Sequence, residues 1–242
     1  MFRTNASIIH SPSLMKSFFA LPGAAIEHKT LGAQVTCKVF GYPEDEVSPL
    51  VEHFDELMNT FVTELMKGPA FEHTTNRLVG FIEQEVPKII SRDGANPQPW
   101  ETAGKVKVSS TGELQASLFP LVRNSIGTLS STELMGSELV KSHAEILEDV
   151  WQVDANIMGF VFGYPAFLPS ISKANRSKAR ILEKMTEWHR QMESVGGIAT
   201  PNAENGRFED VSDLMKQRQR IWSKHKFSMR ARAAVDLAIL WA

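Results

Sequence analysis

The segment 137–197 constrains the fold most strongly, because it predicts two long amphipathic helices separated by a short aromatic hinge. In the first helix, apolar residues recur every three or four positions and form one face: Ile146, Leu147, Val150, Trp151, Val153, Ile157, Met158, Phe160 and Val161. The hinge, 162–169, contains Gly163, which tolerates positive φ, and two prolines, which disfavour helical geometry in the preceding residue. The second helix starts with basic residues and then presents an apolar face: Ile181, Leu182, Met185, Trp188 and Met192. Two helices joined in this way predict a lid that moves as a unit.

The rest of the chain also predicts helices, with minor β-strands. Apolar periodicity and capping residues predict further helices starting at Ser11, at 49–65, 74–89, 114–129 and 211–222, and from Ser228 onward. In the first of these we expect Leu14, Met15, Phe18 and Phe19 to face inward, and we expect Gly68 and Pro69 to end the second. Strands are predicted at 4–10 and 105–109, and loops at 91–104 and 196–208. Residues 24–43 fit either a strand at 35–40 or an irregular loop. The predicted fold class is mainly α.

Composition excludes several classes of protein. The chain has 242 residues, 43% of them apolar, so it is long enough to bury a substantial core. Its net charge of −2 gives no electrostatic footprint for nucleic acid. The single cysteine rules out an intrachain disulfide. No apolar run is long enough for a signal peptide or a membrane-spanning helix, and this leaves the location open.

The candidate metal ligands and nucleophiles fit structural roles best. His143 and His189 have no partner at metal-ligand spacing, and we interpret both as surface or packing residues. The pairs Glu52/His53 and Glu72/His73 lack the second histidine of a zincin motif, so we assign them to solvated helix faces. Cys37 fits a small buried apolar residue better than a nucleophile or a metal ligand.

Charged motifs are equally unspecific. Glu187 with Arg190, and Glu204 with Arg207, match the pattern E-x-x-R, which a charged chain produces by chance. The densest basic cluster is Lys216, Arg218, Arg220, Lys224, His225, Lys226, Arg230 and Arg232. We interpret this cluster as a solvated face, with a docking surface for an acidic partner protein as the alternative.

Four segments together carry a resemblance to a known family. They are LFPLVR at 118–123 leading to LMG at 134–136; LEDVW at 147–151 with Asp154 and then FGYP at 162–165; KAR at 178–180 through EWH at 187–189; and SMRARAA at 228–234 through LWA at 240–242. In this order they resemble helices E, F, G and the opening of helix I of the cytochrome P-450 family of heme-thiolate monooxygenases. The likeness is to the fungal and animal branch that includes the sterol 7-alpha-hydroxylases and prostacyclin synthase.

The resemblance implies a single partial domain, 1–242, that is the front half of a cytochrome P-450 catalytic domain, from helix B to the start of helix I. The complete enzyme would use heme, dioxygen and electrons from a reductase to oxidise an apolar small molecule. This chain would supply the pocket and the lid between helices F and G, with substrate contacts from Phe160, Phe162, Phe167, Leu168, Leu237 and Leu240. The 163–169 loop would offer a membrane contact, since complete family members often lie at the endoplasmic reticulum membrane.

The family's heme-binding signature, Phe-x-x-Gly-x-x-x-Cys-x-Gly, does not occur in this sequence. We therefore expect the chain to be a fragment that binds no heme and is inactive alone, with the apolar residues Leu237, Ile239, Leu240 and Trp241 of its last helix exposed together. The competing hypothesis is a non-enzymatic helical protein that binds a ligand or a partner. The sequence does not identify the substrate, the redox partner, the oligomeric state or the origin of the truncation.

Overall fold

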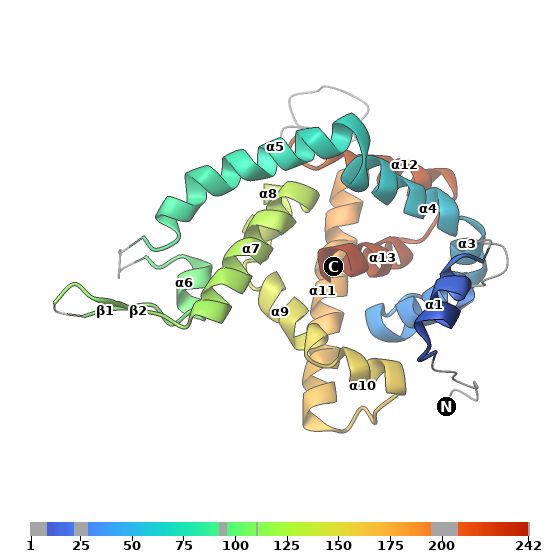
Figure 1. The fold of residues 1–242 in the computed structure, drawn as a ribbon, viewed down its shortest axis with the longest axis horizontal. Helices are drawn as coiled ribbons and strands as arrows, with labels where there is room; N and C mark the ends of the chain where they lie inside the picture. Colours follow the sequence, from blue (N-terminus) through green and yellow to red (C-terminus); the bar gives the residue numbers. More distant parts are fainter. Residues whose placement is uncertain (1–8, 22–28, 92–95, 110, 195–207, 242) are drawn as a thin grey trace.

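The computed structural model describes residues 9–21, 29–91, 96–109, 111–194 and 208–241. Over these residues the chain is mainly helical with a single two-stranded antiparallel hairpin (Figure 1), so the predicted class is confirmed. The α-helices are α1 (Pro12–Phe19), α2 (Lys29–Val35), α3 (Val47–Glu52), α4 (Phe54–Phe61), α5 (Gly68–Glu85), α6 (Pro99–Ala103), α7 (Leu118–Met135), α8 (Ser137–Ser142), α9 (Ile146–Asp154), α10 (Ile157–Phe162), α11 (Pro169–Ser194), α12 (Asp213–Lys224) and α13 (Met229–Trp241). The shorter elements are η2 (Thr36–Phe40), η3 (Glu44–Glu46), η4 (Val62–Met66), η5 (Val86–Lys88), β1 (Lys107–Val108) and β2 (Leu114–Gln115).

Helix α11 is the central helix of the fold. It packs along α9 on one side and α13 on another, and Figure 1 shows it running through the middle of the fold. The apolar face predicted for it is confirmed, because Ile181, Leu182, Met185, Trp188 and Met192 are all buried. These side chains belong to one continuous apolar core with residues of η2, α9, α12 and α13.

The segment 137–161 is not one long helix, as the periodicity predicted, but the three helices α8, α9 and α10. The chain leaves helical geometry at His143, where φ is −142°, and again at Asn156, where φ is −122°. The apolar residues of α9 and α10 continue the three-and-four spacing across Asn156, so the spacing carries no sign of that break. The breaks let α8 and α9 each bury its own apolar residues against the core.

Several predictions about the first half of the chain are wrong. Residues 35–40 are neither strand nor loop but the end of α2 and the π-helical turn η2. Gly68 and Pro69 begin helix α5 instead of ending its predecessor, because proline is favoured at the first helical positions. The predicted loop 91–104 contains α6, and the helix expected from 114 begins at Leu118, after strand β2.

The remaining boundaries agree better with the sequence. The strand predicted at 105–109 is β1, and α12 and α13 lie at the predicted positions. The helix predicted at 74–89 ends earlier, because α5 stops at Glu85 and Pro87 lies in η5. The strand at 4–10 and the loop at 196–208 fall almost entirely outside the described residues.

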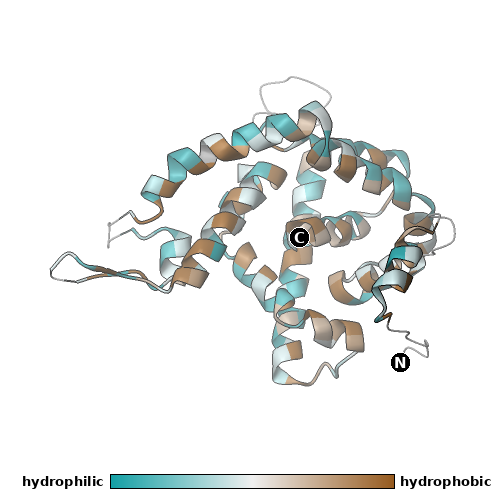
Figure 2. Cartoon of the chain, in the orientation of Figure 1, coloured by the Kyte–Doolittle hydropathy of each residue, from teal (hydrophilic) through white to brown (hydrophobic). Residues whose placement is uncertain are grey.

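Figure 2 shows hydrophobic residues along most of the helices. On several helices large apolar side chains are exposed. On α1, the residues expected to face inward, Leu14, Met15, Phe18 and Phe19, are all exposed. Phe71, Val79 and Ile82 on α5 and Leu118, Phe119 and Ile126 on α7 are exposed as well. The last helix behaves in the opposite way to the prediction: Leu237 and Leu240 are buried, Ile239 packs against the core, and Trp241 is 37% exposed. On α13, Trp241 is therefore the one large apolar side chain that is exposed, whereas α1, α5 and α7 each expose several.

Candidate functional site

An apolar groove of about 370 Å³ lies where α7, α9 and α13 meet. Its walls are largely aliphatic and aromatic: Phe119, Val122, Arg123, Ile126, Gly127, Ser130, Leu147, Trp151, Leu240 and Trp241. A volume of this size is within the range of small-molecule sites, which are concave, mostly apolar and fitted with few polar groups. The groove is the candidate binding site among the described residues that best matches an apolar ligand.

Gly127 on α7 makes room for the floor of the groove. A β-carbon at this position would lie 3.0 Å from Cζ2 of Trp151, so a glycine lets the indole approach the helix backbone. The Trp151 indole Nε1 donates a hydrogen bond to Asn124 Oδ1 at 3.1 Å, which fixes the ring. The aromatic floor is therefore held rigidly between α7 and α9.

Arg123 is the cation of the groove. Its guanidinium lies 4.7 Å from the centroid of the Trp151 ring and 5.3 Å from that of Phe119. Such cation–π contacts stabilise the side chain against the aromatic faces. On the opposite wall, Trp241 Nε1 donates to Asp154 Oδ1 at 2.9 Å, and the Trp241 ring contacts Phe40 with centroids 5.8 Å apart. The arrangement suits an apolar ligand that carries an anionic end.

The six substrate-contact residues predicted from the sequence do not gather in this groove. Leu240 is in its wall, whereas Leu237, only 1% exposed, lies in the core beneath. Phe160 is buried and Leu168 is partly buried against the core. Phe162 and Phe167 are 65% and 82% exposed, at the turn between α10 and α11.

The chain turns tightly between α10 and α11, and residues 158–169 form the α10–α11 corner. Gly163 adopts φ +69°, and the Tyr164 amide donates to the Gly159 carbonyl at 2.8 Å. Gly159 permits α10 to lie against α11, since a β-carbon there would come within 2.4 Å of Ile171 Cδ1. Exposed apolar and aromatic side chains cover the outside of the corner: Met158, Phe162, Tyr164 and Phe167. The hinge predicted from glycine and proline is confirmed as a turn, while its motion stays a prediction.

Lys178 lies on the inner side of the same corner. Its ammonium is 3.9 Å from the centroid of the Phe160 ring and donates to the Lys38 carbonyl at 3.2 Å. Burial, and to a smaller extent the nearby Arg230 guanidinium, lowers the pKa of Lys178 to about 8. A lysine amine in this environment exchanges its proton near neutral pH.

We expect the stability of the protein to rise between about pH 8 and pH 10, because the unfolded chain, with a lysine pKa of about 10.4, then binds a proton that folded Lys178 has released. After solvent screening the gain is on the order of 1 kcal/mol. Urea unfolding across this pH range measures it. The rise should be absent in Lys178→Met and retained in the control Lys173→Met; a rise of equal size in both variants would contradict the assignment.

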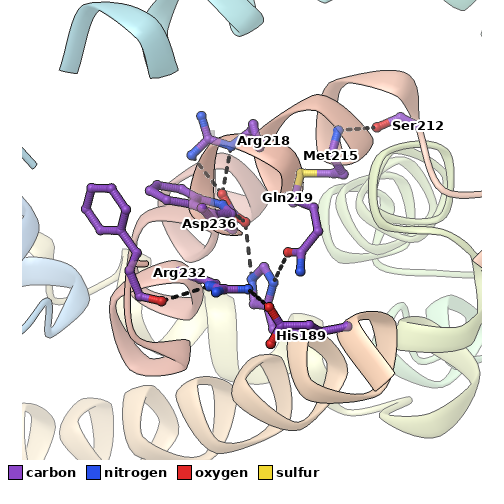
Figure 3. A network of polar contacts seen from close by, with 10 residues as sticks. His189, Ser212, Met215, Arg218, Gln219, Arg232 and Asp236 are labelled. Atoms are coloured by element: carbon purple, nitrogen blue, oxygen red, sulfur yellow. Dashed lines mark hydrogen bonds and ion pairs between the residues drawn. The ribbon is translucent and has the colours of Figure 1, made fainter. Parts of the chain in front are cut away.

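A second polar site is a fully buried network between α11, α12 and α13 (Figure 3). The Asp236 carboxylate accepts a hydrogen bond from Arg218 Nε at 2.8 Å and one from Trp222 Nε1 at 3.3 Å. His189 Nε2 lies 3.2 Å from Asp236 Oδ2, and its Nδ1 lies 3.3 Å from the Gln219 side-chain oxygen. Burial by itself would raise the pKa of Asp236, but Arg218 and His189 together lower it below its usual value. The network fits a structural tie between three helices, and His189 has the packing role predicted for it.

The basic cluster at 216–232 is a solvated face only in part, because Arg220, Lys224, Lys226 and Arg230 are exposed. Arg218 and Arg232 are 3% and 4% exposed, so the prediction is wrong for these two residues. Arg232 donates to the Phe227 carbonyl at 3.0 Å and to Glu193 at 3.1 Å. The alternative of one continuous docking surface for an acidic partner loses the same two residues. Glu187 and Arg190, by contrast, form an exposed ion pair within one turn of α11.

Cys37 does not fit a heme-thiolate ligand. It lies in η2 and packs partly buried against the core, where burial and then the Glu44 carboxylate raise the pKa of its thiol. A thiolate ligand requires the opposite environment. Among the described residues, one group could hold a metal ion, formed by His53, Glu56 and His225.

No protein-family model matches the chain, and comparisons with curated proteins and with solved structures give no significant match. In the described part of the chain, no helix has both the length and the apolar character needed to cross a bilayer.

Proposed function

We propose that this chain is the substrate-covering front half of a heme-thiolate monooxygenase of the cytochrome P-450 type. The observation that carries the proposal is the α10–α11 corner, where Met158, Phe162, Tyr164 and Phe167 expose apolar surface next to a long central helix. Exposed apolar clusters of this kind mark ligand, membrane or protein contacts. In the complete enzyme, this corner is the lid over an apolar substrate and contacts the membrane surface.

The exposed apolar faces of α5 and α7 support the same proposal. A helix normally turns its apolar side toward a core, yet Val79 and Ile82 on α5 and Phe119 and Ile126 on α7 face outward. In the proposed enzyme these faces pack against the remainder of the catalytic domain. That remainder supplies the heme, its thiolate ligand and the surface for the reductase, and the substrate is an apolar small molecule.

The groove between α7, α9 and α13 favours a second candidate function, a non-enzymatic protein that binds an apolar ligand. It has a rigid aromatic floor and the Arg123 cation within this chain, so it requires no further domain. Its ligand would be an apolar anion, of which a fatty acid is the simplest example. The two candidates differ in where the ligand contacts the protein.

We expect apolar ligands to slow amide hydrogen exchange at 160–169 more than at 119–130. Lids belong to the least stable parts of a fold, so a ligand that covers them gives a large change in protection. The measurement is exchange mass spectrometry with a sterol and a fatty acid. Phe167→Ala should weaken the protection at the corner, while the matched exposed variant Ile126→Ala should leave it unchanged.

The opposite pattern would contradict the lid. Protection confined to 119–130 and the end of α13, lost in Ile126→Ala and kept in Phe167→Ala, selects the ligand-binding protein instead. The transcript downstream of Ala242 gives an independent test. A reading frame that continues into the heme-binding cysteine loop supports the monooxygenase, and a stop codon with no such sequence nearby counts against it.

A further inference from the structure

His53, Glu56 and His225 come together on the side of the molecule where α4 meets the end of α12. His53 lies between α3 and α4, Glu56 is in the first turn of α4, and His225 follows α12 as its C-terminal cap. The possible ligand atoms of the three side chains all lie within 4.8 Å of one another. His225 Nε2 is 2.8 Å from Glu56 Oε2. All three residues are partly buried, so neighbouring residues restrict their side chains while an ion from solvent can still reach them.

The chemistry of the three side chains is that of a zinc ligand set. Two imidazoles and one carboxylate, with water in the fourth position, are a recurrent tetrahedral arrangement with ligand distances of about 2.0–2.2 Å. Such distances put neighbouring donor atoms about 3.4 Å apart in a tetrahedron. The ligand atoms lie up to 4.8 Å apart, about 1.4 Å more than this requirement, so side-chain rotation has to bring them closer to complete the site.

The two imidazole rings are stacked, with centroids 3.5 Å apart and an angle of 22° between their planes. Phe227 contacts the edge of the His53 ring at a centroid distance of 6.2 Å and closes one side of the cluster. Parallel rings do not aim both lone pairs at one ion, so binding must turn at least one of them. Among the contacts that the structure describes, the His53 side chain makes ring contacts but no hydrogen bond or salt bridge, so its ring is the one that can turn.

Lys224 competes with a cation for Glu56. Its ammonium lies 2.9 Å from Glu56 Oε1, so a metal ion has to displace this ion pair before it can bind that oxygen. The Lys224 side chain is 62% exposed, so it can swing into solvent when a metal ion takes its place.

We propose that His53, Glu56 and His225 bind one Zn²⁺ ion, with water as the fourth ligand, and that the ion ties α4 to the end of α12. The proposal is independent of the function proposed above, because none of the three residues lines the groove or the α10–α11 corner. Binding stabilises the folded state by mass action, since the ligands come from segments 169 residues apart and converge only after folding.

The test is calorimetric titration of the purified chain with zinc chloride after treatment with a chelator. We expect one high-affinity equivalent and a higher melting temperature with zinc. His53→Gln, Glu56→Gln and His225→Gln should each weaken this equivalent at least about tenfold, the size of effect that follows disturbance of a metal site. The control His73→Gln, which alters a histidine on α5, should leave affinity and stoichiometry unchanged.

Lys224→Met separates a metal site from a mere ion-pair cluster. Removing the competing ammonium should tighten zinc binding several-fold, whereas a cluster that serves only as an ion pair would lose stability and gain no affinity. The cobalt(II) spectrum of the wild type and of Lys224→Met provides a readout that does not depend on stability. Zinc binding that is equally strong in His225→Gln, or that falls equally in His73→Gln, would overturn the proposal.

Discussion

Replacing Asp236 with alanine is expected to lower the free energy of unfolding by about 3 to 5 kcal/mol, the cost of leaving one member of a buried charge pair without its partner. Asp236 is fully buried and neutralises Arg218, which is 3% exposed and lies 2.7 Å away. Alanine would leave the guanidinium buried with the Leu57 carbonyl as its remaining described acceptor. Total stabilities of about 5 to 15 kcal/mol make this a loss that partly unfolds the protein at 37 °C. Urea denaturation followed by circular dichroism measures it.

Two controls make the result specific. Asp55→Ala removes an exposed carboxylate that pairs with Lys29, and it should cost less than about 1 kcal/mol. The double variant Asp236→Leu with Arg218→Met removes both charges and should recover much of the loss, because apolar replacements of buried pairs are often neutral. If the double variant is less stable than Asp236→Ala, the network contributes through its geometry and not through charge compensation.

The pH dependence gives the same prediction a second readout. The pKa of Asp236 is lower in the folded state than the usual value of about 3.9, so the unfolded chain takes up the proton first as the pH falls. The stability contributed by Asp236 is therefore complete above about pH 5 and is lost as the pH falls below about 4. Asp236→Ala should show a shallower decline in stability over this range.

Leu182→Ala is expected to lower the free energy of unfolding by about 2 to 5 kcal/mol, since it opens a cavity in the core beside the middle of α11. Leu182 is 1% exposed, and its Cδ1 lies 3.0 Å from the position of a β-carbon on Gly41, so η2 and α11 are in close contact there. Gly41 has φ +74°, which favours glycine and lets the backbone approach the leucine. Denaturant unfolding of the variant gives the magnitude.

The matched control is Phe167→Ala, in the turn that precedes α11. Phe167 is larger than Leu182 but 82% exposed, so its removal should change stability by less than about 0.5 kcal/mol. A loss of more than 1 kcal/mol in Phe167→Ala would mean that Phe167 is buried in solution, by a second copy of the chain or by a different packing of the corner. Sedimentation of the wild type distinguishes these two cases.

The sequence by itself determined the parts of the fold that depend on short-range chemistry. The apolar face of α11 follows from residues three and four positions apart, and the turn at Gly163 follows from a glycine between two helices and a nearby proline. The same reasoning placed α12, α13 and strand β1. It failed where one local signal has two meanings. A Gly-Pro dipeptide can end one helix or begin the next, and Gly68–Pro69 begins α5.

Only the tertiary structure decided how the polar residues are used. The sequence predicted Arg218 and Arg232 to lie on a solvated basic face, because their neighbours in sequence are charged. Nothing in the local sequence shows that Asp236 forms an ion pair with Arg218. The sequence indicated no partner for His53, because His225, whose ring stacks on it, lies far away along the chain. Tertiary packing also separated Leu240, in the groove, from Phe162 and Phe167, at the corner. A side chain's partners depend on which helices pack together, and that choice is made by the summed burial of many apolar residues, which no short stretch of sequence contains.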